Sequence, residues 1–210
     1  MGPAFEDPGL GDLSIDDYAD DLLALLTHLE IDRAVMSGVS MGGYVAFGML
    51  RRAPDRVAGL ILSNTRATAD SVEARAARDK TIDLARREGP AGIATAMVPK
   101  LLGETMRREQ PDLADAVRRL ILVNSTEGIV AALGAIKTRP DATPTLGSVS
   151  CPALVIAGEE DAIIPVADAE AMHTAMPGSS LIVLPRVGHL SNLESPAAWG
   201  SAVEAFLGRE

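Results

Sequence analysis

The sequence predicts an α/β fold in which a parallel sheet carries helices on both faces. Short, almost continuously apolar runs such as "VAGLILSN" and "PALVIAGEED" recur along the chain, which is typical of strands buried on both faces. Amphipathic helical patterns lie between these runs, and strands that alternate with helices favour parallel pairing. At 210 residues with 47% apolar residues, the chain is long enough for one domain with a substantial core.

The first elements predict a helix, a strand and a second helix. "LSIDDYADDLLALLTHLEI" repeats leucine at helical spacing, and Ser14 with Asp17 matches a capping box at its start. "RAVMSGVS" is a short apolar run that ends in small residues, as a strand does before a tight turn. "MGGYVAFGMLRRAPDRV" then returns to helical spacing. The strand "VAGLILSN" follows.

No strand pattern occurs between residues 66 and 147, where helical patterns follow one another. These patterns are "DSVEARAARDKTIDLARREG", "GIATAMVPKLLG", "PDLADAVRRLILVN" and "TEGIVAALGAIKTR". A run of helices between two strands of a sheet is typical of a lid over one end of that sheet. We therefore expect residues 1–65 and 148–210 to form the core and residues 66–147 to form a helical cap insertion.

The last part of the chain predicts two more strands and two helices. "PALVIAGEED" and "SLIVLP" are the strands, and an alanine-rich helix lies between them. "SPAAWGSAVEAFLG" predicts a closing helix with Ser195 as N-cap and Pro196 at its first position.

The charge of the chain disfavours nucleic acid and membrane surfaces as partners. The formal charge is −10, from 29 acidic and 19 basic residues spread along the sequence, and this charge repels phosphates and anionic lipids. No stretch reaches the roughly 18 apolar residues of a membrane span, and the first residues do not match a signal peptide. We expect a cytoplasmic protein.

Cysteine and histidine usage gives no sign of a disulfide or a metal site. Cys151 is the sole cysteine, and its place before Pro152 at the start of a strand predicts a small buried filler. His28, His173 and His189 are too scattered to form a helical pair of metal ligands. We expect no bound metal and read His28 and His173 as non-catalytic.

The stretch "GVSMGG", residues 38–43, contains a G-x-S-x-G pattern between a predicted strand and a predicted helix. In this setting a strained turn holds the serine hydroxyl clear of the backbone, so Ser40 is a candidate nucleophile. We expect Gly38, Gly42 and Gly43 to be required because a side chain there would clash with its neighbours. The N–H of Met41 lies at the helix N-terminus, where it can bind a developing oxyanion.

A serine nucleophile needs a base, and the base needs an orienting carboxylate. "IAGEEDAIIP" places three acids after a predicted strand, and "LPRVGHLSNLE" places His189 after the next one. Carboxyl ends of parallel strands lie at one edge of a sheet, so Ser40, one of these acids and His189 can meet there.

The motifs "GVSMGG", "GEEDAIIP" and "GHLSNLESP", in the chain order serine, acid, histidine, resemble those of the α/β-hydrolase family. A narrower likeness is to 3-oxoadipate enol-lactonases and related small esterases. The resemblance places the family's acid at Asp161, and Glu159 and Glu160 are then interpreted as solvated loop charges.

This resemblance implies a serine hydrolase that acts on a small ester or lactone and needs no cofactor. Ser40 would be the nucleophile, His189 the base, Asp161 its orienting acid and the Met41 amide an oxyanion donor. Ile163 and Leu190, which flank the acid and the base, are candidate substrate-binding residues. Two alternatives use the same triad, a cofactor-free haloperoxidase or perhydrolase and a C–C hydrolase. A third is a non-catalytic binding module.

The chain departs from the family pattern at its N-terminus. Members usually carry four strands before the helix that begins here near Ser14, and about thirteen residues stand in their place. The family's second oxyanion donor comes from that region, so we expect impaired activity. The strand in "RAVMSG" should become an open edge able to pair with another copy. Of three interpretations, a fragment, a short form completed by another chain and a remnant without catalysis, we favour the first.

Overall fold

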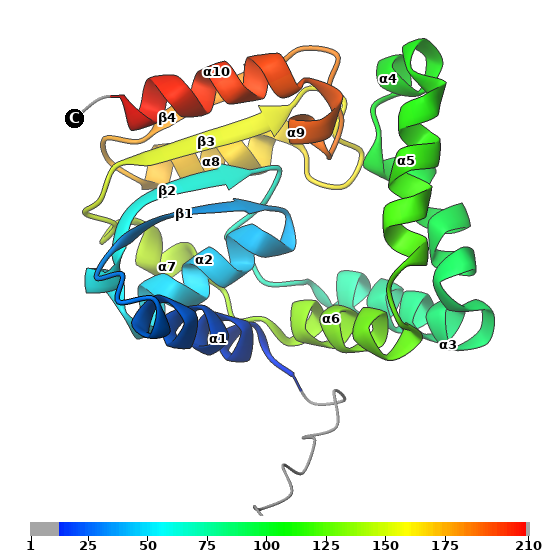
Figure 1. The fold of residues 1–210 in the computed structure, drawn as a ribbon, viewed down its shortest axis with the longest axis horizontal. Helices are drawn as coiled ribbons and strands as arrows, with labels where there is room; N and C mark the ends of the chain where they lie inside the picture. Colours follow the sequence, from blue (N-terminus) through cyan, green and yellow to red (C-terminus); the bar gives the residue numbers. More distant parts are fainter. Residues whose placement is uncertain (1–12, 209–210) are drawn as a thin grey trace, which may run out of the picture.

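The computed structural model describes residues 13–208 and contains a four-stranded parallel sheet (Figure 1). The strands are β1 (Ala34–Val39), β2 (Val57–Ser63), β3 (Ala153–Gly158) and β4 (Ser180–Leu184), in the order β1-β2-β3-β4. All neighbouring pairs are parallel, which confirms the predicted sheet. Among the described residues β1 pairs only with β2, so this strand forms an edge, as predicted.

Helices fill the segments between the strands. Before β3 they are α1 (Ile15–His28), α2 (Met41–Arg52), the 3-10 helix η2 (Pro54–Arg56), α3 (Val72–Leu101), α4 (Glu104–Glu109), α5 (Pro111–Leu122), α6 (Thr126–Thr138) and α7 (Thr143–Leu146). After β3 they are α8 (Val166–Ala175), α9 (Ser191–Glu194) and α10 (Pro196–Leu207).

Side chains along each central strand alternate between two separate apolar clusters. On one face, Leu60 of β2 and Val155 of β3 pack with α1, α2 and α8. On the other face, Ile61 of β2 and Ile156 of β3 pack against Phe206 of α10, which lies over β3 and β4 in Figure 1. Both faces are covered, and every position of these two strands except Ser63 holds an apolar residue or glycine. This double burial accounts for the continuous apolar runs in the sequence.

The helix ends agree with the sequence at α1 and in part at α10. The Ser14 hydroxyl accepts a hydrogen bond from the Asp17 N–H, and the Asp17 carboxylate accepts one from the Ser14 N–H, so the predicted capping box is confirmed. Ser195 precedes Pro196 at the start of α10, as predicted, but its side chain makes no capping hydrogen bond to the described residues.

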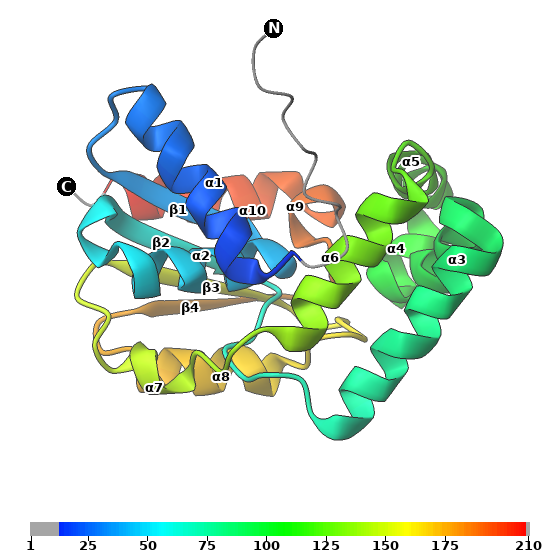
Figure 2. The same cartoon turned by 90° about the horizontal axis from the view of Figure 1, so that it is seen from below.

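Helices α3 to α6 lie together beyond one end of the sheet (Figures 1 and 2). The first two predicted helices of this region are joined in α3, which is kinked at Gly89, where φ is 62°, just before Pro90. No single helix in residues 13–208 is both long and apolar enough to cross a membrane. Helices α5 and α6 reach that length and composition only as a pair bent by 96°.

Candidate active site

Four loops at the carboxyl end of the sheet carry the candidate site. Ser40 follows β1, Asn64 follows β2, Asp161 follows the end of β3 and His189 follows β4. Since the strands are parallel, these loops meet at one edge. Ser40 and His189 line one cavity of about 250 Å³, and Asp161 is hydrogen-bonded to His189. The structure therefore brings together the three residues that the sequence singled out.

Ser40 occupies a strained turn between β1 and α2. Its φ is 52° and its ψ is −112°, a conformation that residues with a side chain rarely adopt. A Cβ at Gly38 would lie 2.2 Å from the carbonyl carbon of Gly42, and one at Gly43 would lie 2.5 Å from Thr65. These two glycines let strand, turn and helix approach closely. The prediction for Gly42 was wrong, because a Cβ there meets no described atom within 4 Å.

Met41 is the first residue of α2, so its N–H belongs to the helix terminus that has no intrahelical acceptor. The positive end of the helix dipole therefore lies beside the Ser40 side chain. Within the described residues the Ser40 hydroxyl makes no hydrogen bond, and none joins it to His189. Hydrogen bonds between a nucleophile and its base are often long in unliganded enzymes and shorten when substrate binds.

Asp161 is held by several donors. Its Oδ1 accepts hydrogen bonds from the N–H groups of Ile163, at 2.8 Å, and Ile164, at 2.9 Å. Its Oδ2 lies 2.8 Å from His189 Nδ1 and 3.0 Å from Asn64 Nδ2. The side chains of Asp161 and His189 are 0% and 2% exposed. These contacts fix the orientation of the His189 imidazole ring relative to the Asp161 carboxylate.

The electrostatics of this pair decide which nitrogen of His189 carries the proton. Burial alone would raise the pKa of Asp161, but the hydrogen bond and charge of His189, with the hydrogen bonds from Ile164 and Asn64, outweigh burial and hold that pKa below its usual value. An ionised carboxylate only accepts, so His189 donates from Nδ1 and its Nε2 keeps a free lone pair when the ring is neutral.

Asn64 is a residue of the site that the sequence reasoning missed. Its Nδ2 donates to Asp161 and to the Gly188 carbonyl oxygen, both at 3.0 Å, and its Oδ1 accepts from Ser191 Oγ at 2.5 Å. Asn64 thus ties the acid to both sides of the His189 loop. Its φ of 47° suits asparagine better than most residues. The available signal was its place directly after an apolar strand.

Two glutamates join the His189 loop and the acid loop to the N-terminal end of α4. Glu194, 3% exposed, accepts N–H hydrogen bonds from Gly188 and Leu190, which flank His189, and from Gly103. Glu160 accepts from the N–H and the hydroxyl of Thr105. The interpretation of Glu160 as a solvated charge was therefore wrong, because its carboxylate holds Thr105 in the first turn of α4.

We expect Asn64→Asp to weaken both stability and turnover. The change replaces a donor by a second carboxylate beside Asp161, which raises the pKa of one of the two acids and leaves the Gly188 carbonyl without its partner. The thermal midpoint at neutral pH should fall by several degrees, for a cost of about 2 kcal/mol. Asn124→Asp, at an exposed helix end, is the control.

The loss of stability should depend on pH in a defined direction. The lowered pKa of Asp161 contributes stability above the usual aspartate value, and this contribution disappears as the pH falls through the folded-state pKa. In the variant, one of the two neighbouring carboxyl groups has a raised pKa, and its ionisation destabilises the folded state as the pH rises. The gap in unfolding free energy should therefore be largest near neutrality and shrink as the pH falls through the usual aspartate pKa and below it, as denaturant titrations can measure. A gap that is constant with pH would contradict the role of Asn64.

The cavity beside Ser40 has a mostly apolar wall supplied by the helical region. The apolar lining side chains are Ile93, Met97, Leu101, Ile121, Ile129, Leu133, Ile136 and Ile163. Ile163 thus lies in the wall, as the sequence suggested. Leu190 instead packs against the apolar cluster of Val98, Leu102 and Val117.

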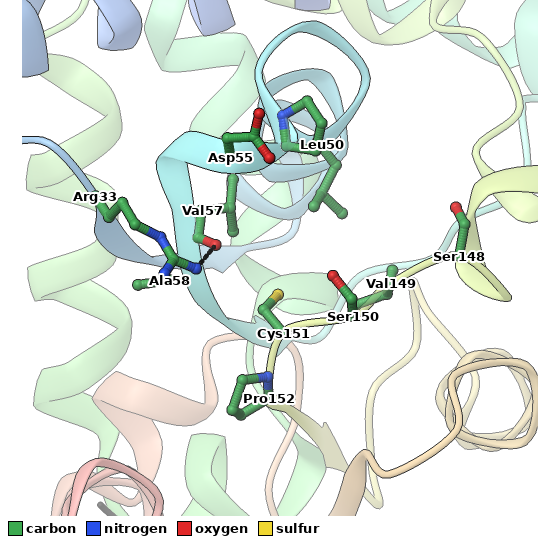
Figure 3. Close-up of a pocket in the computed structure, with 11 residues that line it drawn as sticks. Arg33, Leu50, Asp55, Val57, Ala58, Ser148, Val149, Ser150, Cys151 and Pro152 are labelled. Carbon is green, nitrogen blue, oxygen red and sulfur yellow. Dashed lines mark hydrogen bonds between the residues drawn. The ribbon is translucent and has the colours of Figure 1, made fainter.

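A larger cavity, of about 590 Å³, opens near the other end of the strands (Figure 3). Arg33, Asp55 and Cys151 are among its lining residues, and Arg33 donates to the Val57 carbonyl oxygen. Cys151 packs against the main core but is only partly buried, so the prediction of a small buried filler is confirmed in part. Neither Ser40 nor His189 lines this cavity, so size alone does not identify the candidate site.

Comparisons with known proteins agree with this geometry. A sequence model of the Ndr family, an α/β-hydrolase family, matches residues 8–208. The chain is 32% identical to 3-oxoadipate enol-lactonase 2 of Acinetobacter baylyi over 200 residues, which cover 95% of this chain and 73% of the relative.

Solved structures give the same result. A thermophilic esterase from Thermogutta terrifontis with malate bound has a TM-score of 0.90 and 42% identity, over 94% of this chain and 73% of that one. The enol-lactonase from Burkholderia xenovorans has a TM-score of 0.86 and 30% identity, over 96% and 75%. The chain therefore belongs to the α/β-hydrolase family and is a hydrolase of the α/β-hydrolase type.

Proposed function

We propose that this chain hydrolyses a small ester or lactone through a triad of Ser40, His189 and Asp161. The observation that carries the proposal is the buried Asp161–His189 pair, whose histidine lines the same cavity as a serine on a strained turn. The names of the relatives, among them enol-lactonases and an esterase, support the same reaction class.

In this mechanism His189 Nε2 takes the proton of the Ser40 hydroxyl as Ser40 Oγ attacks the carbonyl carbon. Asp161 keeps the ring oriented and stabilises the imidazolium that forms. The Met41 N–H donates to the oxyanion. Collapse of the tetrahedral intermediate releases an alcohol, which takes the proton from His189, and leaves an acyl group on Ser40. A water molecule, activated by His189, then releases the acid and restores the serine.

The helical region determines which acyl groups fit. We propose that residues 66–147 act as a cap, since their helices supply most of the wall of the cavity next to Ser40. A cavity of about 250 Å³ with an apolar wall suits a short acyl group or a small lactone ring.

Turnover by the purified chain tests this proposal. p-Nitrophenyl acetate and butyrate report ester hydrolysis by colour, and proton release at constant pH reports opening of small lactones. We expect saturable kinetics with at least one substrate. The chain unfolded in urea is the control, since surface nucleophiles cleave p-nitrophenyl esters without a site. If the folded chain hydrolysed none of these substrates faster than the unfolded control, the result would favour a non-catalytic binding module.

We also propose that the edge strand β1 pairs with a second copy of the chain. Backbone groups on an edge strand are open to pairing, and the Val35 side chain on this strand is 38% exposed. Light scattering should give a mass above 21.9 kDa that falls upon dilution. Val35→Lys should lower this mass. Val183→Lys, on the other edge strand β4, where Val183 is 40% exposed, should leave the mass unchanged, which separates pairing through β1 from pairing through β4. A concentration-independent monomer would contradict the pairing.

A further inference from the structure

The cavity beside Ser40 carries a basic side chain in its apolar wall. Arg78, on the first turns of α3, lines this cavity together with Ser40 and His189. Among the described residues that line it, none is an aspartate or a glutamate. The side chain of Asp161 is 0% exposed, so its charge is directed at His189. An approaching substrate therefore meets a guanidinium group in a cavity that no described carboxylate lines.

Arg78 is fixed by an ion pair that occupies only part of its guanidinium group. Its Nε donates to Asp70 Oδ2 at 3.0 Å, and its side chain is 27% exposed. No described residue accepts a hydrogen bond from its two Nη groups. These two groups form a planar pair of donors, the geometry that binds a carboxylate with two parallel hydrogen bonds.

The charges behind Arg78 leave an excess of one positive charge. Asp70 also accepts from Arg139 Nη1 at 2.7 Å, so two guanidinium groups share one carboxylate. Burial alone would raise the pKa of Asp70, but hydrogen bonds from Arg78 and Arg139 outweigh burial and hold it below its usual value. Asp70 is therefore ionised, and it neutralises only one of its two partners.

Arg139 cannot itself reach a ligand. Its side chain is 2% exposed, its Nη2 donates to the Thr68 carbonyl oxygen at 2.8 Å, and its guanidinium lies 4.2 Å from the centroid of the Tyr44 ring. Arg139 therefore acts on a ligand only through its electrostatic field, which adds positive potential near Arg78. This is a local feature, since the chain as a whole has a formal charge of −10.

A second cavity adjoins the first at Arg78. This cavity, of about 210 Å³, shares Arg78, Thr81 and Ile163 with the cavity next to Ser40, and it is also lined by Arg66 and Asp70. Arg66 is already paired, since its Nε lies 3.5 Å from the carboxylate of Asp168. Arg78 therefore stands at the junction of an apolar cavity and a more polar one.

We propose that Arg78 binds a carboxylate group of the substrate, so that the substrate is an ester or lactone that also carries a free carboxylate. This inference rests on the proposed function of Ser40. A carboxylate is strongly disfavoured in an apolar cavity unless a cation pairs with it, and an Arg–carboxylate pair in such a place is worth considerably more than one in water. The apolar wall holds the acyl chain, and the Nη groups of Arg78 hold its charged end.

Matched substrates test the proposal. The monomethyl esters of succinic, glutaric and adipic acids carry a carboxylate at three spacings, and the corresponding methyl ester amides have the same shape without the charge. We expect kcat/KM, followed by methanol release, to favour the carboxylate by at least about tenfold for one spacing. Arg78→Gln should reduce this ratio to about one, and Arg78→Lys, which keeps the charge but not the planar fork, should give an intermediate ratio.

Arg75→Gln is the control, because Arg75 lies one turn earlier on α3 and is exposed. It should leave the ratio unchanged. Equal rates for acid and amide in the wild type, or a preference that survives in Arg78→Gln, would overturn the proposal. A purely structural role of Arg78 would lower the thermal midpoint and both rates together, without a change in their ratio, and would overturn it too.

A binding measurement separates this inference from the proposed function. Calorimetry with Ser40→Ala and methyl hydrogen glutarate detects the carboxylate site without any turnover. Binding that is lost in the Ser40→Ala, Arg78→Gln chain supports the site even if no ester is hydrolysed. If the Ser40→Ala chain binds the acid no better than the amide at any of the three spacings, the carboxylate site does not exist.

Discussion

Replacement of Ser40 by alanine should lower kcat/KM for p-nitrophenyl butyrate by at least about a thousandfold. The reason is that the acyl group then has no oxygen to which it can transfer, while the cavity and the Asp161–His189 pair stay in place. The Ser40 side chain makes no hydrogen bond to a described residue, so its removal should leave the thermal midpoint within a few degrees of the wild type.

Ser37→Ala is the matched control for this change. Ser37 lies three residues earlier, on the edge strand β1, and is exposed. It should keep full activity. If Ser40→Ala retained more than about a tenth of the wild-type rate, attack by Ser40 could not be the main route of hydrolysis.

Replacement of His189 by alanine should have an effect of similar size, because without a base the serine hydroxyl is a poor nucleophile at neutral pH. Loss of the ring also leaves the buried carboxylate of Asp161 with one fewer donor, so a lower thermal midpoint is expected in addition. Kinetics and thermal unfolding on the same preparation measure both effects.

His173→Ala is the control for this second change. The His173 ring lies on α8 and bonds to Ser179 through Nδ1, at 2.8 Å, and it is not among the residues that line the cavity of Ser40. Its loss should leave turnover unchanged. Equal losses of activity in His173→Ala and His189→Ala would indicate general damage to the fold rather than a base at position 189.

The sheet could be predicted from the sequence because each of its strands has a local signature. Residues such as Leu60, Ile61 and Val155 are buried on one or other face, and double burial leaves a run of apolar letters that is visible without the fold. The loops that carry Ser40, Asp161 and His189 were predictable for a related reason, since each follows such a run and parallel pairing brings their ends together.

The supporting contacts could not be predicted, because they join residues that are far apart in the chain. Asn64 contacts Gly188, and Arg139 contacts Asp70, through hydrogen bonds that leave no local pattern. The same limit explains why the partial exposure of Cys151 could not be predicted. The cavity beside it is also lined by residues that precede β2, such as Arg33 and Asp55, which lie far from Cys151 in the sequence.

Covalent labelling with a fluorophosphonate tests the central claim most directly. A phosphonyl group should be transferred to the wild-type chain and, after digestion, should be found by mass spectrometry on the peptide that contains Ser40. Labelling should be absent from Ser40→Ala and much slower in His189→Ala. Rapid labelling of His189→Ala would contradict the triad, and a label on any other residue of the native wild-type chain would contradict Ser40 as the nucleophile.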